Sequence, residues 1–336
     1  MDRNVETLTV LARNRTLGDT WHQDGADSRM GTFEAPQDGE NSRTADWYAD
    51  LSSRFLAEPL EESDVEVDPG NGICWCSFDY TARPCFSPAV IRDIGRVHTI
   101  VRATFEARRS APAPLKYLAW RSRMPGVWNL GGDLRLIVDL VRRNDREGLE
   151  HYAYRSVHEL HTNWVSLNLP ILTAVIIQGD ALGGGFEAAL SSNLIVAEKR
   201  ARFGLPEILF NLFPGMGAYS FLARRASPAI AHSMVMSGRI YEAEELHKLG
   251  IIDVLAEDGK GEEAFYDYVA KNAGRHNAHR AILSSRQQIN PLTLKELQDV
   301  ADIWVDTALA LSRTDIRKME RLVGAQDRQR ARVQTP

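Results

Sequence analysis

The sequence lacks long apolar runs and a strong excess of either charge. None of its uninterrupted apolar stretches approaches the roughly 18 residues that a membrane-spanning helix requires. Residues 1–6 have no apolar core of the kind that a signal peptide carries. The net charge is only −5, which provides no basic field for nucleic acid. We therefore expect a cytoplasmic protein that binds neither membranes nor nucleic acid.

Cysteine is scarce as well. The three cysteines, Cys74, Cys76 and Cys85, are an odd number within one short segment. Zinc sites use paired cysteines in spacings such as C-x-x-C, which this segment does not have. We predict that the three residues are reduced and serve in packing, and we expect no metal or other cofactor.

Apolar residues, by contrast, make up 44% of the chain, which is enough for a large core. Composition and periodicity divide the sequence into four regions. We predict a mobile N-terminal extension (1–47), an α/β catalytic core (48–256), a helical C-terminal region (257–327) and a polar tail (328–336). Strand and helix patterns alternate within the core, which favours a layered α/β architecture.

The most informative segment surrounds a triple glycine at 183–185. Two apolar runs, 171–177 and 194–197, predict buried strands on either side of it. Glu187 and Glu207 follow the glycines, twenty positions apart. On one continuous helix they would be separated by about 30 Å. Glycines and prolines between them predict instead that the chain folds back.

Three interpretations of this glycine turn compete. Gly183, Gly185 and Ala188 match the G-x-G-x-x-A pattern of dinucleotide binding, but adjacent glycines meet that template easily. An NAD-dependent dehydrogenase would also leave the second glycine turn, 131–132, and Glu207 without a role. A structural turn beside two solvated glutamates is the ordinary expectation. Against it, both glutamates lie among Phe, Leu, Ile and Pro residues.

The third interpretation is an oxyanion hole. The backbone N–H groups of Gly132 and Gly184 are able to converge on a thioester carbonyl and to stabilise the enolate that forms when the neighbouring carbon loses a proton. A helix that starts near Gly184 would direct its positive end to the same oxygen. Glu187 and Glu207 would then serve as acid and base, and burial would keep one of them protonated. Either glutamate fits either role.

Three motifs resemble the crotonase (enoyl-CoA hydratase/isomerase) superfamily in sequence and in order. They are NLGGDL at 129–134, ALGGGFE at 181–187 and FGLPE at 203–207. Two further segments, LFPGMGAYSF at 212–221 and IWVDTA at 303–308, are similar to the bacterial diffusible signal factor synthases, which make cis-2-unsaturated fatty acids. The resemblance covers roughly residues 60–327.

The resemblance implies a crotonase-like spiral of ββα units, followed by helices that pack subunits into a homotrimer or a dimer of trimers. It implies oxyanion-hole donors at Gly132 and Gly184 and a catalytic pair at Glu187 and Glu207. The implied enzyme is a dehydratase and thioesterase that acts on a 3-hydroxyacyl thioester of acyl carrier protein. Its product would be a cis-2-unsaturated fatty acid that serves as a quorum-sensing signal.

Other functions stay open at this point. An enoyl-CoA hydratase of fatty acid metabolism would share the fold and both glutamates. The resemblance also implies capture by the receiver domain of a sensor kinase, and a catalytically idle binding partner is a third possibility. Retention of Glu187 and Glu207 argues against idleness.

Aromatic and apolar residues near these motifs have two interpretations. Trp304 is ordinarily a core aromatic at such a position in a helical region. The functional alternative is that it lines a tunnel for an acyl chain together with Met216, Phe210 and Leu212, which are the predicted substrate-binding residues.

Charged and metal-binding residue types give weaker signals. His158 and His161 share a helix face, but they lack the H-E-x-x-H spacing and a third ligand, so a solvated or capping role is predicted. The pairs 142–143 and 224–225 are arginines. They are ordinarily surface charges, and the alternative is a docking site for an acidic carrier protein.

Overall fold

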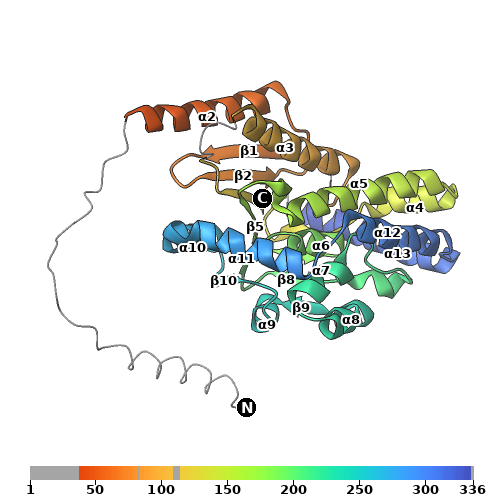
Figure 1. Ribbon diagram of the computed structural model, residues 1–336. Coiled ribbons are helices and arrows are strands. Elements are labelled where there is room, and N and C mark those ends of the chain that lie inside the picture. The colour runs from red at the N-terminus through yellow and green to blue at the C-terminus, as the bar shows by residue number, and fades with distance from the viewer. Residues whose placement is uncertain (1–37, 82, 109–113, 334–336) are drawn as a thin grey trace, which may run out of the picture. The chain divides into compact units, whose positions relative to one another are not determined.

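The computed structural model describes residues 38–81, 83–108 and 114–333 (Figure 1). Its strands are β1 (Ser63–Asp68), β2 (Ile73–Phe78), β3 (Tyr117–Ser122), β4 (Val127–Asn129), β5 (Leu172–Ile177), β6 (Asp180–Leu182), β7 (Leu194–Glu198), β8 (Arg202–Gly204), β9 (Ile240–Glu242) and β10 (Val254–Ala256). Its α-helices are α2 (Asp38–Ala57), α3 (Pro88–Ala107), α4 (Leu134–Arg142), α5 (Arg146–Trp164), α6 (Gly184–Leu190), α7 (Ala218–Arg225), α8 (Pro228–Ser237), α9 (Ala243–Lys248), α10 (Gly261–Asn272), α11 (His276–Ile289), α12 (Leu294–Leu309) and α13 (Arg313–Val333). Short 3₁₀ helices are η1 (Ser166–Asn168), η2 (Pro206–Phe210) and η3 (Ala273–Arg275).

From β3 to β8, successive strands alternate between two sheets. The first sheet has the order β1-β2-β3-β5-β7-β10 and the second has the order β4-β6-β8-β9. Neighbours run parallel except β1 with β2 and β8 with β9. In each of the pairs β3–β4, β5–β6 and β7–β8, the first strand therefore lies in the first sheet and the second strand lies in the second sheet. Each following pair lies one position further along both sheets. This is the spiral of ββα units that the sequence resemblance implies, and the expected fold is confirmed.

The central strands of the first sheet are buried on both faces. Because successive strand residues point to opposite faces, Cys74 and Cys76 of β2 enter the main core, with α3 and α5. Trp75, between them, enters a second cluster, where its ring meets Phe265 of α10 edge to face at 5.2 Å. Burial on both faces explains why the parallel strands are nearly continuous apolar runs. All three cysteines are buried, Cys85 included.

The first described helix is part of this core. α2 starts at Asp38, and Trp47 is buried against Phe105 of α3, with ring centroids 5.3 Å apart. The packed structure therefore begins before the boundary predicted at residue 48, because an aromatic residue of the expected extension fills a gap beside α3. Residues 1–37, which hold the rest of that extension, lie outside the described residues.

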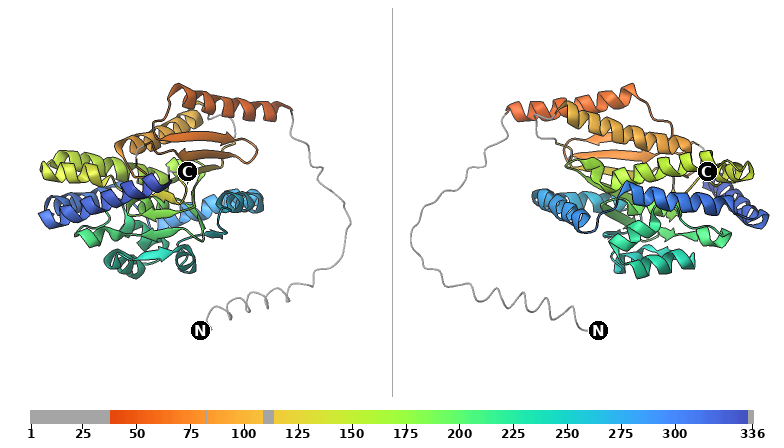
Figure 2. Two further views of the ribbon diagram at one scale, coloured as in Figure 1. Left: turned by 180° about the vertical axis from the view of Figure 1, so that it is seen from behind. Right: turned by 45° about the vertical axis from the view of Figure 1, so that its right-hand side comes forward.

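The C-terminal region is helical, as expected, and reaches back to the first half of the chain. Figures 1 and 2 show α12 beside α5, and α13 packs against α4. α13 continues to Val333, so the predicted polar tail is helical over its described part. Within the described ranges, no helix is long and apolar enough to cross a membrane.

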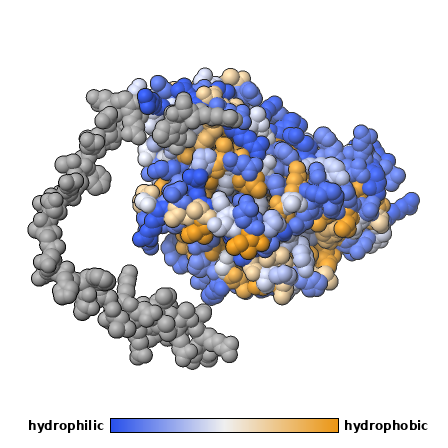
Figure 3. Space-filling view, in the orientation of Figure 1, coloured by the Kyte–Doolittle hydropathy of each residue, from blue (hydrophilic) through white to orange (hydrophobic). Residues whose placement is uncertain are grey.

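α11 has no fully buried residue in the single chain. Its Ile282 and Ile289 are 66% and 85% exposed. Figure 3 shows apolar residues in several places on this face of the molecule, among hydrophilic ones. The predicted role of residues 257–327 in subunit packing stays a prediction, which such exposed apolar side chains favour.

Candidate active site

Glu187 comes from the first turn of α6. β6 ends at Leu182, and Gly183 then takes a positive φ of 52°, which turns the chain into the helix. Every residue of α6 is buried, and Phe186 packs on Phe203 of β8 with ring centroids 5.3 Å apart. The strand, the glycine turn and the helix thereby hold the Glu187 side chain inside the protein, where it is 1% exposed.

The Glu187 carboxyl group receives backbone hydrogen bonds at the start of α7. Its Oε1 accepts from the N–H groups of Met216 at 2.7 Å and Ala218 at 2.9 Å. Free N–H groups at a helix start favour a negative charge. Burial raises the pKa of Glu187, and the N–H groups of 216–218 oppose part of that rise.

Glu207 follows Pro206 in the first turn of η2. Its carboxyl group lies against the turn that starts α6, because an ideal Cβ on Gly183 would lie only 2.5 Å from Glu207 Oε1. The residue as a whole is half-buried, but its Oε2 is buried without a hydrogen-bond partner among the described residues. Burial raises the pKa of Glu207, and the charge of Glu187 raises it further.

The two carboxyl groups therefore differ in how well they hold a negative charge. Glu187 has backbone donors on one oxygen, whereas no described residue donates to Glu207 Oε2. Two carboxylates in one buried site do not both ionise readily. We infer that the pair shares one proton near neutral pH, with the charge preferentially on Glu187 and the proton on Glu207.

The two glycine turns predicted from the sequence meet in space. An ideal Cβ on Gly184 would lie 3.3 Å from the Gly132 nitrogen, and one on Gly131 would lie 2.9 Å from the Gly184 nitrogen. Gly131 also has a φ of 95°, which L residues rarely adopt. Glycine is required at 131 because any side chain there would separate the turns.

Hydrogen bonds to the preceding carbonyl groups fix the direction of both N–H groups. Gly131 O accepts from Phe86 N at 2.7 Å, and Gly183 O accepts from Glu187 N at 3.0 Å. In a planar trans peptide, the C=O and the following N–H point in opposite directions. The N–H of Gly132 therefore points away from Phe86, and that of Gly184 points out of the N-terminal end of α6.

Both turns and both glutamates border one cavity of about 40 Å³. The cavity brings together all eight residues selected from the sequence, which are Gly132, Gly184, Glu187, Glu207, Phe210, Leu212, Met216 and Trp304. Five further lining residues were not selected: Leu134, Ile137, Tyr152, Ala153 and Gly215. A volume of this size holds only a few water molecules. A larger ligand therefore enters only when lining side chains move.

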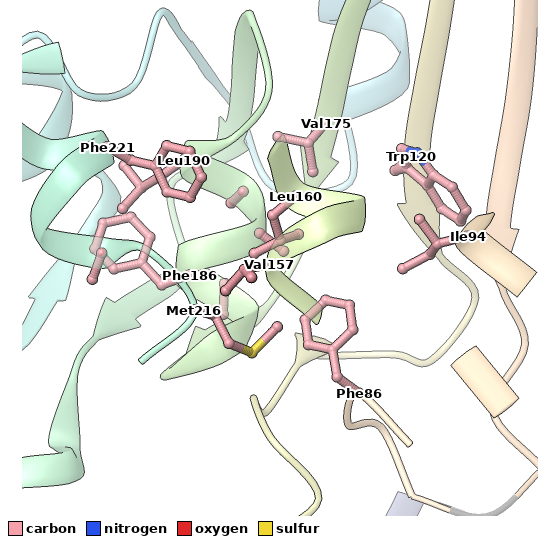
Figure 4. Close-up of a cluster of buried hydrophobic side chains, with 14 of the residues drawn as sticks. Phe86, Ile94, Trp120, Val157, Leu160, Val175, Phe186, Leu190, Met216 and Phe221 are labelled. Carbon is pink, nitrogen blue, oxygen red and sulfur yellow. The ribbon is translucent and has the colours of Figure 1, made fainter. Parts of the chain in front are cut away.

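Trp304 reaches the cavity from α12, in the C-terminal region. It is 7% exposed, and an ideal Cβ on Gly215 would lie 2.4 Å from its Cγ, so the indole packs directly on the glycine backbone. Met216 covers Gly184, because an ideal Cβ there would lie 2.6 Å from the Met216 sulfur. Figure 4 shows Met216 among buried side chains of the main core, which also include Val157 and Phe86. Trp304 is thus both a core aromatic and a wall of the cavity.

Polar side chains that hold the Gly131 turn in place could not be identified from the sequence. Asn129 Oδ1 accepts from Gly131 N at 2.7 Å, and its Nδ2 donates to the Tyr80 hydroxyl at 2.9 Å. The Tyr152 hydroxyl donates to Phe86 O at 2.8 Å and accepts from Asp133 N at 2.9 Å. In the sequence, Tyr152 is one more amphipathic-helix residue, and nothing in its spacing signals these contacts.

The histidine and arginine candidates have structural contacts. His158 Nδ1 lies 3.1 Å from Glu159, and His161 Nε2 lies 3.0 Å from Leu292 O. A cluster of three or more metal-ligating side chains is absent from the part of the chain that the structure describes. Arg142 pairs with Glu320.

The second arginine pair is not a free surface charge. Arg224 pairs with Glu296. The side chain of Arg225 is only 2% exposed and donates to backbone carbonyls of Leu190, Ile251 and Ser192. The expectation of an ordinary surface charge is therefore wrong for Arg225, because its guanidinium group binds buried carbonyl groups.

Comparison with known proteins places these motifs in one region. Residues 122–281 match the family described as Enoyl-CoA hydratase/isomerase, and this range contains both glycine turns and both glutamates. Trp304 lies beyond it. The chain is 29% identical over 213 residues to a probable mitochondrial enoyl-CoA hydratase 2 of Arabidopsis thaliana, which covers 62% of this chain and 62% of that relative. The chain thus spans about three fifths of the length of this relative.

Solved structures share the fold at low sequence identity. An enoyl-CoA hydratase from Bacillus halodurans superposes with a TM-score of 0.63 at 19% identity, over 77% of this chain and 98% of that one. DspI of Pseudomonas aeruginosa superposes with a TM-score of 0.58, also at 19% identity, over 74% of this chain and 96% of that one. At such identities the likeness establishes the fold alone.

Proposed function

We propose that this member of the crotonase superfamily, which carries an enoyl-CoA hydratase/isomerase region, catalyses the reversible hydration of a 2-enoyl thioester. The observation that carries the proposal is the convergence of two carboxyl groups and two glycine turns on one cavity. Hydratase relatives such as the one from Arabidopsis thaliana support this choice of reaction.

The carbonyl oxygen of the thioester would accept hydrogen bonds from Gly132 N–H and Gly184 N–H. When water adds at C3, negative charge moves onto this oxygen as an enolate forms. Donors that are already oriented stabilise such a charge without reorganising during the reaction. The glycine turns thus lower the barrier to forming the enolate.

The glutamates would move the protons. In hydration, the Glu187 carboxylate removes a proton from the attacking water while the hydroxide oxygen bonds to C3. Glu207 then gives its proton to C2, so the product gains the elements of water. Dehydration reverses each transfer and starts with the proton on Glu187 and the charge on Glu207. One shared proton therefore serves both directions.

Replacing each glutamate tests this assignment. Glu187→Gln and Glu207→Gln should each lower kcat for hydration of a 2-enoyl-CoA by about 10²-fold or more, because each removes one proton transfer. Loss of the enoyl-thioester absorbance measures the rate. An exposed glutamate that is ion-paired with Lys199, changed by Glu257→Gln, should leave the rate unchanged. Near-normal rates in both cavity variants would refute the proposal.

A second candidate function is synthesis of a cis-2-unsaturated fatty acid. The substrate would be a 3-hydroxyacyl thioester of acyl carrier protein, and hydrolysis would follow dehydration. One observation favours it: the two segments that resemble diffusible signal factor synthases meet at the cavity, where Trp304 packs on Gly215. Mass spectrometry of the products decides. Free cis-2-enoic acid supports this candidate, and an intact thioester as the sole product contradicts it.

A further inference from the structure

We propose that Tyr152 is a positioning residue that fixes the direction of the Gly132 N–H group. Tyr152 lies on α5 and its ring borders the cavity. The inference rests on the proposed function, because it assigns Gly132 to an oxyanion hole. It concerns a residue that contributes no proton and no direct bond to the thioester.

The Tyr152 hydroxyl links two backbone segments that are distant in sequence. It donates to Phe86 O at 2.8 Å and accepts from Asp133 N at 2.9 Å. Phe86 precedes α3, and Asp133 caps the start of α4. The side chain is 6% exposed, so water does not readily replace either bond.

These two bonds act on the peptide units on either side of Gly132. On one side, the Asp133 N–H is tied directly to the hydroxyl. On the other, Phe86, whose carbonyl the hydroxyl holds, donates its own N–H to Gly131 O at 2.7 Å. Gly131 O and the Gly132 N–H belong to one rigid peptide plane. Tyr152 therefore restrains the plane that carries the oxyanion donor through Phe86, and it directly restrains the next plane, which carries the Asp133 N–H.

Packing gives Tyr152 a second means of restraint. An ideal Cβ on Gly132 would lie 3.3 Å from the Tyr152 hydroxyl oxygen, so the phenol sits close against the glycine. Burial raises the pKa of Tyr152 well above its ordinary value. The hydroxyl thus stays protonated and keeps both its donor and its acceptor role across the working pH range.

Tyr152→Phe keeps the ring and removes only the hydroxyl. Because the Gly132 N–H then samples more directions, kcat for hydration should fall about 10-fold, below the 10²–10³-fold loss of a whole oxyanion donor. KM should change by less than about threefold, because the lost interaction is made mainly in the transition state. Tyr117→Phe is the matched control, since Tyr117 is buried in the second core cluster. Its kcat should stay at the wild-type value.

A spectroscopic readout separates positioning from general loosening of the fold. Butyryl-CoA with ¹³C at the carbonyl is saturated at C2 and C3 and cannot be hydrated. Its carbonyl stretch should move to lower wavenumber on binding to the wild-type protein, because N–H donors polarise the bond. Tyr152→Phe should show a smaller displacement, and Tyr117→Phe the full one. If Tyr152→Phe does not fold, 3-fluorotyrosine at 152 should move the band from its wild-type position, because its hydroxyl accepts from Asp133 N–H more weakly and donates to Phe86 O more strongly. An unchanged band would then overturn the positioning role.

The outcomes distinguish this inference from the proposed function. A wild-type protein that displaces the carbonyl band but hydrates no 2-enoyl thioester overturns the proposed function. The size of the band displacement in Tyr152→Phe, compared with wild type, then decides the role of Tyr152. An active wild type with equal bands and equal kcat in Tyr152→Phe overturns the positioning role alone. A wild type that binds butyryl-CoA without displacing its band overturns the inference, because no N–H then reaches the carbonyl.

Discussion

Glu187 and Glu207 share a cavity but not a set of hydrogen bonds. Backbone donors at the start of α7 reach Glu187, whereas Glu207 Oε2 is buried without a hydrogen-bond partner in the described ranges of the chain. An ionised Glu207 is therefore stabilised less well than an ionised Glu187, which favours Glu187 as the base in the proposed hydration. As pH rises, Glu187 therefore ionises before Glu207, and the late ionisation of Glu207 affects the stability of the folded protein.

Glu207→Gln should stabilise the folded protein above the ordinary pKa of glutamate. A carboxyl group with a raised folded-state pKa contributes stability that is full below its unfolded pKa and lost as pH rises through the folded one. Glutamine does not ionise, so the variant avoids that loss. We expect a gain on the order of 1 kcal/mol at pH 8 and none near pH 4. Urea unfolding at both pH values measures it.

Glu257→Gln serves as the control, because Glu257 is an exposed glutamate. Its free energy of unfolding should change by less than about 0.5 kcal/mol at either pH. Equal stability of Glu207→Gln and wild type at pH 8 would contradict the inferred burial penalty.

At the scale of elements, the site lies where strands of the two sheets lead into helices. The buried strands β5 and β7 and the capped helix α3 follow from apolar runs and from Ser87-Pro88, so they are predictable. β4, β6, β8 and β9 have three residues each. Such strands are too short for a periodic pattern. Pairing with neighbouring strands in the folded protein stabilises them. Tyr152 is unpredictable for a similar reason, since only the fold brings Phe86 to it.

Gly131→Ala should disrupt both glycine turns. An added Cβ would lie 2.8 Å from Leu182 O and 2.9 Å from Gly184 N, so the turns must separate. We expect a loss of about 10²-fold or more in kcat. The positive φ of 95° adds strain of about 1–3 kcal/mol. Initial rates and thermal unfolding measure the two effects.

Gly250→Ala measures the backbone strain of a positive φ without the crowding that an added Cβ causes at Gly131. Gly250 has a φ of 71°, and an added Cβ would meet nothing within 4 Å. This variant should lose about 1 kcal/mol of stability and keep its activity. If Gly131→Ala also kept full activity, the contact between the turns would have no part in catalysis.

At the scale of the whole molecule, the C-terminal helices complete a cavity that the α/β core leaves open on one side. α12 packs along α5 and brings Trp304 onto Gly215. The tryptophan lies outside residues 122–281, the region that matches the Enoyl-CoA hydratase/isomerase family. Under the proposed function, it is a wall residue that would contact the acyl chain. Because the cavity measures about 40 Å³, the acyl chain of the proposed substrate would displace part of this wall.

Trp304→Ala should widen the cavity. We expect the preference for longer over shorter acyl chains, expressed as the ratio of their kcat/KM values, to rise about 10-fold. Removing a buried tryptophan should also cost about 3–5 kcal/mol of stability. Phe265→Ala, in the second core cluster, should show a similar loss of stability without a change in chain-length preference. Parallel changes in both variants would mean that Trp304 acts through stability alone.

The central claim is that the glutamate pair adds and removes water at C3 of an acyl thioester. Its most direct test is incubation of a 3-hydroxyacyl-CoA with the protein in H₂¹⁸O, followed by mass spectrometry of the thioester. Reversible dehydration predicts that ¹⁸O replaces the hydroxyl oxygen at C3, and that Glu187→Gln and Glu207→Gln prevent the exchange. A thioester that keeps its original oxygen at C3, while ¹⁸O appears only in released carboxylate or nowhere, would contradict the account.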